Sequence, residues 1–116
     1  MQKKLILIIP ILFILKINEI KVISYNIRYN NMNDGINVWE NRRSTITNFI
    51  IDENPDFAGL QEVTYAQLLF LSESFENHDF IGVGRDDGKT KGEFSPIFYK
   101  KNEYKAFSYT HLTLPT

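Results

Sequence analysis

Hydrophobic and polar residues alternate in short blocks along the chain, and these blocks predict a β-α-β unit. Lys21 to Asn26 is typical of a strand, and the apolar run that follows Asn54-Pro55 and ends at Gln61-Glu62 is typical of a second, buried strand. The segment between them has helical periodicity. A crossover of this kind joins parallel strands, so both strands are expected to end at the same edge of one sheet.

The first helix is predicted to begin at Asn37, whose side chain can cap the free backbone amides while Glu40 reaches back in a capping box. Trp39 falls on the apolar face of this helix and is predicted to lie in the core. Arg42 and Arg43 follow Trp39. They are candidates to hold a phosphate at the sheet edge, although a solvated helix face is the commoner position for such residues.

A second helix is predicted directly after the second strand. Thr64 and Gln67 form a capping box there, and an apolar stripe follows as far as Phe75. His78 lies in the polar connection after this helix. A lone loop histidine beside an aspartate is usually exposed, so no role is assigned to it.

A long hairpin is predicted in the last part of the chain. A strand at 80–84 leads through a polar loop at 85–93 into a returning strand at 94–99, and 101–107 is a candidate for one more strand. The loop residues Asp86-Asp87-Gly88 lack the alternating spacing of a calcium loop. Two interpretations of the loop stay open: a glycine turn with solvated charges, or a loop that contacts a substrate phosphate.

Two polar residues stand where the predicted parallel strands end, and they are the first site candidates. Asn26 ends the first strand and Glu62 the second, so both should lie within reach of a common ligand. Amide and carboxylate oxygens are suitable ligands for a hard divalent cation. The alternative is that Asn26 only caps a turn and that Glu62 is a solvated charge at a strand end.

Composition limits the classes of function. The 116 residues allow one domain, and with 43% hydrophobic and 14% aromatic residues they are enough to build a core. A net charge of −1 with scattered Lys and Arg argues against tight nonspecific binding to nucleic acid. The absence of cysteine excludes disulfides, thiolate metal sites and cysteine nucleophiles.

The first 20 residues are expected to be a signal peptide or an amino-terminal anchor. A short basic start precedes an apolar run at 5–15, which is short for a bilayer span and lacks the usual small-residue cleavage site after it. The alternative is a buried first strand or helix. The leader implies a secreted or periplasmic protein, membrane-anchored if the leader is retained.

Three stretches together resemble the endonuclease/exonuclease/phosphatase superfamily, which has the DNase I-like fold. They are Val22 to Tyr29, then Trp39 with the two arginines, then Pro55 to Glu62, in matching order and spacing. The segments 82–88 and 92–99 are similar to the secreted bacterial branch of that family. The resemblance runs from about residue 21 to about residue 107, so the predicted fold class is α/β, the amino-terminal half of a four-layer α/β-sandwich.

The resemblance implies a metal-dependent phosphoester hydrolase. It makes Asn26 and Glu62 catalytic residues that hold Mg²⁺ or Mn²⁺, and it places Arg85 and Glu93 on the substrate side. The implied substrate is a nucleic acid, a phospholipid head group or a small phosphate ester, and no stable protein partner is expected. In such a mechanism the metal polarises a phosphoryl oxygen while a histidine-aspartate pair activates water.

The second half of the family pattern is missing from this sequence. His111 imitates the Thr-His element of that half but comes too early in the chain, and residues 108–116 resemble a non-native tail. The chain is therefore predicted to be an inactive amino-terminal fragment with an exposed sheet face that favours aggregation. The alternative is a complete small α/β module that binds a ligand without catalysis.

Overall fold

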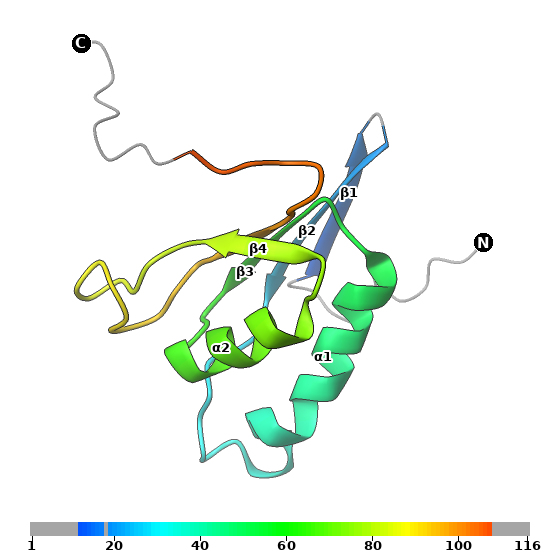
Figure 1. The fold of residues 1–116 in the computed structure, drawn as a ribbon. Helices are drawn as coiled ribbons and strands as arrows, with labels where there is room; N and C mark the ends of the chain where they lie inside the picture. Colours follow the sequence, from blue (N-terminus) through cyan, green and yellow to red (C-terminus); the bar gives the residue numbers. More distant parts are fainter. Residues whose placement is uncertain (1–11, 18, 108–116) are drawn as a thin grey trace.

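The computed structural model describes residues 12–107 apart from residue 18, so most of the predicted leader, the predicted tail and His111 lie outside the described residues. Helix α1 (Trp39–Glu53) follows a short 3-10 turn, η2 (Gly35–Asn37), and α2 (Tyr65–Ser74) follows the third strand (Figure 1). The five strands form one mixed sheet in the order β1-β2-β3-β5-β4. These are β1 (Leu12–Ile17), β2 (Ile20–Asn26), β3 (Phe57–Gln61), β4 (His78–Ile81) and β5 (Ile97–Lys100).

The predicted β-α-β unit is confirmed. β2 and β3 pair in parallel, from Val22 opposite Phe57 to Asn26 opposite Gln61, and α1 forms the crossover between them. β1 pairs antiparallel with the outer side of β2. Part of the segment assigned to a leader therefore forms an edge strand, and export of the protein stays a prediction.

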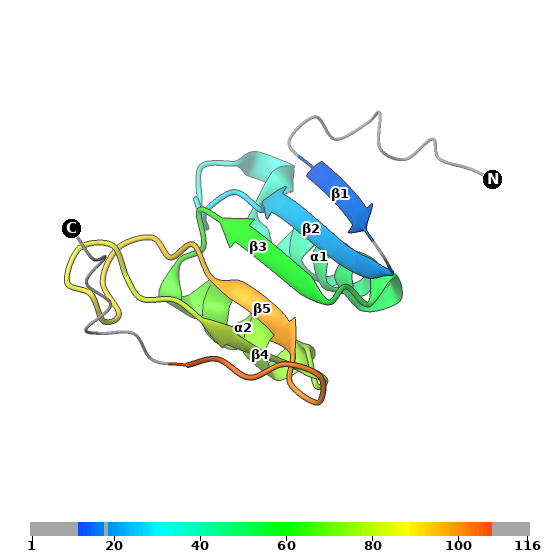
Figure 2. The ribbon, with the colours of Figure 1, turned by 90° about the horizontal axis from the view of Figure 1, so that it is seen from above.

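Both helices cover the same face of the sheet (Figure 2), and the hydrophobic core lies between them and the strands. Trp39 is 3% exposed, which confirms its predicted place in the core. One sheet with one helical layer is half of a four-layer α/β-sandwich, as predicted. Within the described residues, neither helix is long and apolar enough to cross a membrane. The largest fully buried side chains include Phe98, Ile23, Ile27, Ile50, Leu60, Leu68 and Leu71.

One of the two predicted helix caps is wrong. α1 begins at Trp39 after Val38, which has an extended backbone, and no side chain caps the helix. Asn37 instead ends the 3-10 turn, and its carbonyl accepts a hydrogen bond from Arg42. The capping box of α2, formed by Thr64 and Gln67, is confirmed.

The predicted hairpin is confirmed, with different strand limits. β4 and β5 pair antiparallel, but β4 begins at His78 and ends at Ile81, and β5 covers only 97–100. Residues 101–107 form a turn and an irregular segment, so the additional strand predicted there is wrong. The segment instead lies against the sheet, where the Tyr104 ring packs on Phe57 with centroids 4.5 Å apart.

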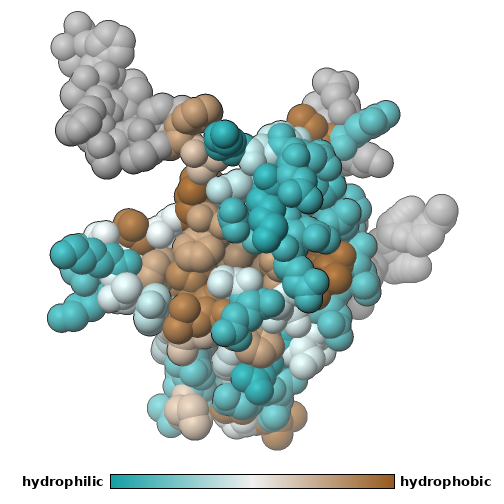
Figure 3. All heavy atoms as spheres, in the orientation of Figure 1, coloured by the Kyte–Doolittle hydropathy of each residue, from teal (hydrophilic) through white to brown (hydrophobic). Residues whose placement is uncertain are grey.

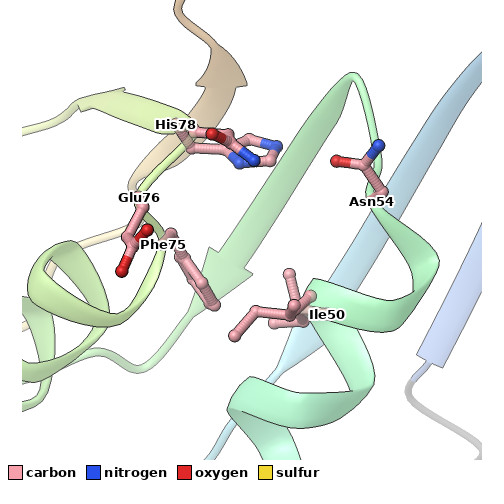
Figure 4. Close-up of a pocket in the computed structure, with 7 residues that line it drawn as sticks. Ile50, Asn54, Phe75, Glu76 and His78 are labelled. Carbon is pink, nitrogen blue, oxygen red and sulfur yellow. The ribbon is translucent and has the colours of Figure 1, made fainter.

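His78 is buried, so the prediction of an exposed loop histidine is also wrong. It begins β4, its Nε2 lies 2.7 Å from the Pro55 carbonyl, and its ring contacts Phe75 edge-on. Figure 4 shows His78 and Phe75 facing Ile50 of α1 and Asn54, the residue that follows α1, across a pocket of about 270 Å³. A histidine with this tertiary partner secures the strand against the turn that precedes β3.

Asp56 is a buried carboxylate, 6% exposed, at the beginning of β3. Its Oδ1 accepts a hydrogen bond from the Lys21 backbone at 3.1 Å, its Oδ2 accepts one from the Tyr104 hydroxyl at 2.9 Å, and the Lys100 ammonium lies 3.7 Å away. Burial alone raises the pKa of Asp56, but these donors outweigh it and hold that pKa below its usual value. The ionised carboxylate therefore joins β2, β5 and the segment after β5.

A folded-state pKa below the unfolded value makes stability depend on pH. The contribution of Asp56 is present above about pH 4, where the unfolded carboxyl is ionised, and is lost as pH falls through the folded pKa. Asp56→Asn is expected to lower the free energy of unfolding at pH 7 by about 1–3 kcal/mol, and by less at pH 3. Urea denaturation at both pH values measures this. Exposed Asp52→Asn is the control, and an equal loss at both pH values for Asp56→Asn would contradict the role of its charge.

The sheet face opposite the helices carries apolar side chains. Phe57 lies opposite Tyr99 and Ile81 opposite Ile97 in the strand register, and these four residues line a groove of about 240 Å³. Ile97 is 42% and Ile81 is 47% exposed. On another side of the molecule, hydrophobic residues also gather over α2 and β4 (Figure 3). A surface of this kind favours association.

Two adjacent residues of β5, Ile97 and Phe98, lie on opposite faces of the sheet, so substituting each one tests one face. Ile97→Thr is expected to reduce self-association with little loss of stability, because Ile97 is partly exposed and threonine keeps the strand propensity. Phe98→Ala is expected to cost about 3–5 kcal/mol, because Phe98 is fully buried. Sedimentation velocity and urea denaturation measure these effects. Unchanged association for Ile97→Thr would show that another surface causes it.

Candidate active site

The ends of β2 and β3 bring Asn26 and Glu62 together, as the sequence predicted. Asn26 is the last residue of β2, and Glu62 follows the last residue of β3. The Asn26 amide Nδ2 donates a hydrogen bond to Glu62 Oε2 at 2.8 Å. The parallel ladder continues to this point, because the Ile27 backbone N–H donates to the Gln61 carbonyl at 3.2 Å. The pair is thus fixed at the edge of a rigid sheet.

Glu62 has a left-handed backbone, with φ of 62°. This conformation turns the chain out of β3 towards Val63, whose backbone exchanges two hydrogen bonds with Phe94. The Glu62 carboxylate is half-buried and also accepts a hydrogen bond from the Tyr29 backbone at 3.4 Å. A strained residue that carries a site candidate is typical of functional positions. Its carboxylate oxygens keep lone pairs for a further ligand.

Asn26 is held from both ends of its amide. Its Oδ1 accepts a hydrogen bond from the Arg28 backbone at 2.9 Å, while its Nδ2 donates to Glu62. In this geometry Asn26 orients the Glu62 carboxylate. A direct bond from Asn26 to a metal stays a prediction.

The donor set around Glu62 fits part of a magnesium site. Mg²⁺ is commonly bound through one or two carboxylates together with water and substrate phosphate oxygens. Glu62 supplies one carboxylate at a partly exposed edge. Over the part of the chain that the structure describes, no group of three or more His, Cys, Asp or Glu residues could hold a metal ion.

Arg28 and Asp34 close the loop that follows β2. The Arg28 guanidinium forms two hydrogen bonds with the Asp34 carboxylate, at 3.0 and 2.8 Å, and lies over the Tyr29 ring. The hydrogen bond between them raises the pKa of Arg28 and lowers the pKa of Asp34. With Asn37 and Arg42, these two residues line a recess of about 300 Å³.

Arg85 and Glu93 pair with each other rather than with the strand ends. Their side chains lie 3.6 Å apart, and the Arg85 backbone N–H donates to the Glu93 carbonyl at 3.0 Å. Phe94, next to Glu93, pairs with Val63, so this end of the loop lies beside the segment that carries the glutamate. None of the described hydrogen bonds or ion pairs joins either residue to the candidate pair, and their role towards a substrate stays a prediction.

Sequence reasoning assigned no site role to Gln67 and did not predict the contacts of Arg42. The half-buried Arg42 donates to three backbone carbonyls, and a role for it towards a phosphate stays a prediction. Arg43 stacks on Phe70 and lies 3.9 Å from Glu40 on the surface. The capping box was the signal that could have drawn attention to Gln67, since it fixes this side chain near the end of β3.

Solved structures resemble the chain across most of its length. No protein-family model and no curated protein matches it. The endonuclease/exonuclease/phosphatase from Bacteroides vulgatus is 42% identical with a TM-score of 0.73, and the match covers 75% of this chain and 33% of that one. The mannosyl-6-phosphatase Bt3783 from Bacteroides thetaiotaomicron is 40% identical with a TM-score of 0.68, and covers 72% and 32%. The chain therefore carries part of the endonuclease/exonuclease/phosphatase fold.

The predicted resemblance to the endonuclease/exonuclease/phosphatase family is thus confirmed. Humanized D. rerio TDP2 also matches, with a TM-score of 0.57 and coverage of 72% of this chain and 30% of that one, but at 20% identity it supports the fold alone. The chain spans about a third of the length of these solved structures.

The left-handed backbone at Glu62 gives a test of the site geometry. Glu62→Ala and Glu62→Gly both remove the carboxylate, but only glycine adopts positive φ without steric cost. The glycine variant is therefore expected to be more stable than the alanine variant by about 1 kcal/mol. Asp52, inside α1, is the control, since glycine should there be less stable than alanine by about 1 kcal/mol. The same order at both positions in urea denaturation would contradict the conformation of Glu62.

Proposed function

We propose that this chain provides the Asn26–Glu62 edge of the active site of a metal-dependent phosphoester hydrolase. The observation that carries the proposal is the hydrogen-bonded pair at the ends of two parallel strands, in a chain 42% identical to an endonuclease/exonuclease/phosphatase. Glu62 would hold Mg²⁺ or Mn²⁺, and Asn26 would keep the carboxylate oriented. When bound, such a cation supplies stabilisation of negative charge on a phosphoryl group.

The described residues supply only part of the machinery. His78 is the one histidine among them, and it is buried near the beginning of β3, while Glu62 follows its end. At about 3.3 Å per residue of strand, the seven steps from Pro55 to Glu62 put roughly 20 Å between them. A general base must come within hydrogen-bond reach of the proton that it abstracts. Residues 12–107 thus provide no histidine base beside Glu62, and we propose that the 116-residue chain is inactive alone.

A small phosphate ester fits best among the candidate substrates, which also include nucleic acid and phospholipid head groups. A net charge of −1 gives no concentrated basic surface for a nucleic acid. Bt3783, at 40% identity, is a mannosyl-6-phosphatase. The polar recess beside Arg28 and Asp34 could accept a hydroxylated group. We also propose that the protein is exported to the periplasm or the medium and that it has no stable protein partner.

A chimera tests this function. Residues 21–107 replace the matching part of Bt3783, and the release of phosphate from mannose 6-phosphate is measured with and without Mg²⁺. We expect Mg²⁺-dependent hydrolysis by the chimera, none by the 116-residue chain, and a loss of at least about 10²-fold for Glu62→Gln in the chimera. Exposed Glu73→Gln on α2 is the matched control and should leave the rate unchanged.

Two results would contradict the proposal. Hydrolysis by the 116-residue chain would show that the missing groups are not needed. A folded, active chimera whose rate does not change with Glu62→Gln would remove Glu62 from the reaction. A chimera that folds and binds the ester without hydrolysing it would favour the ligand-binding module.

A further inference from the structure

Two side chains from different helices bind the same piece of backbone beside the candidate site. Arg42 of α1 donates to the Ile27 carbonyl at 2.7 Å and reaches the Arg28 carbonyl at 3.5 Å. Gln67 of α2 donates to the same Arg28 carbonyl at 2.9 Å. The backbone just after β2 is therefore held by both helices.

The guanidinium of Arg42 connects two segments of the chain. Besides the carbonyls after β2, it donates to the Asn37 carbonyl at 2.6 Å, in the 3-10 turn before α1. It also lies 5.7 Å from the centre of the Trp39 ring. The rigid fork of an arginine can reach several carbonyls in this way, and the single ammonium of a lysine cannot.

Gln67 connects the segment that carries Glu62 to the loop after Asn26. It is 0% exposed, and its Oε1 accepts a hydrogen bond from the Thr64 backbone at 2.9 Å, two residues after Glu62. Its Nε2 donates to the Arg28 carbonyl. Both ends of this buried amide are therefore occupied.

The backbone that the two helices hold makes direct contact with the candidate pair. The Arg28 N–H donates to Asn26 Oδ1, and the Tyr29 N–H donates to Glu62 Oε1. Arg28 has a left-handed backbone, with φ of 65°. A non-glycine residue keeps this conformation only where its surroundings impose it.

We propose that Arg42 and Gln67 are positioning residues that fix the left-handed turn at Arg28, so that its N–H orients Asn26 and, through it, the Glu62 carboxylate. The inference rests on the proposed function, because the pair that is positioned is the proposed cation site. Neither residue contacts the cation. Partners that orient a metal ligand commonly contribute about 10- to 100-fold to metal affinity.

Amide hydrogen exchange of the 116-residue chain, followed by NMR, tests the positioning without metal. In Arg42→Met and in Gln67→Met, the Arg28 and Tyr29 amides are expected to exchange about tenfold faster relative to the core amides of Ile23 and Leu60. The Asn26 side-chain amide signals should move towards those of a free asparagine. Arg42→Lys should restore the protection only in part.

Arg43→Met is the matched control, since Arg43 neighbours Arg42 but stacks on Phe70 at the surface. It should leave the exchange of the Arg28 and Tyr29 amides and the Asn26 signals unchanged. Equal acceleration at core and loop amides in the Arg42 variant would reveal a purely structural role and overturn the inference. No acceleration at the loop amides would overturn it as well.

A Mn²⁺ titration separates this inference from the proposed function. Broadening of signals around Glu62 in the unmodified chain, lost in Glu62→Gln, supports the cation site, and Arg42→Met should then weaken Mn²⁺ binding about tenfold. If the unmodified chain shows no such broadening, the proposed cation site fails, and the exchange result still decides the positioning role. If Arg42→Met binds Mn²⁺ as tightly as the unmodified chain, the positioning inference is overturned, while the proposed cation site stands.

Discussion

The parallel pairing of β2 with β3 is the constraint on which the candidate site depends. Because α1 crosses over between them, both strands end at the same edge of the sheet, and Asn26 meets Glu62 there. The pair of an amide and a carboxylate, 36 residues apart in the chain, is therefore as rigid as the ladder beneath it.

The backbone just beyond the ends of β2 and β3 also has to be held in place, because it is no longer part of the sheet. Two non-glycine residues with left-handed backbones, Arg28 and Glu62, lie just beyond the strand ends, and such conformations cost free energy. The side chains of Arg42 and Gln67 compensate by binding the backbone from the helices. The helices thus contribute more than a hydrophobic layer, since their first turns also shape the edge where a ligand would bind.

Local signals in the sequence predicted the parts of the structure that local chemistry decides. Periodicity and the crossover rule were sufficient for the β-α-β unit, and the second capping box was correct because its two side chains satisfy each other. Predictions failed where a distant partner decides the outcome. The His78 ring is buried and its Nε2 is within hydrogen-bond distance of the Pro55 carbonyl. Residues 101–107 form no strand, and the Tyr104 hydroxyl in this segment donates a hydrogen bond to the Asp56 carboxylate. The left-handed backbone at Glu62 has no marker in the sequence.

We propose that the candidate site forms one edge of an active site, in a chain that spans about a third of the family structures it matches. The central claim is that Glu62 holds the catalytic cation at this edge. Anomalous diffraction from crystals of the protein grown with Mn²⁺ and inorganic phosphate tests it most directly. We predict a Mn²⁺ peak within coordinating distance of a Glu62 carboxylate oxygen, with Asn26 still bound to that carboxylate. A Mn²⁺ peak elsewhere, with none at Glu62, would contradict the account.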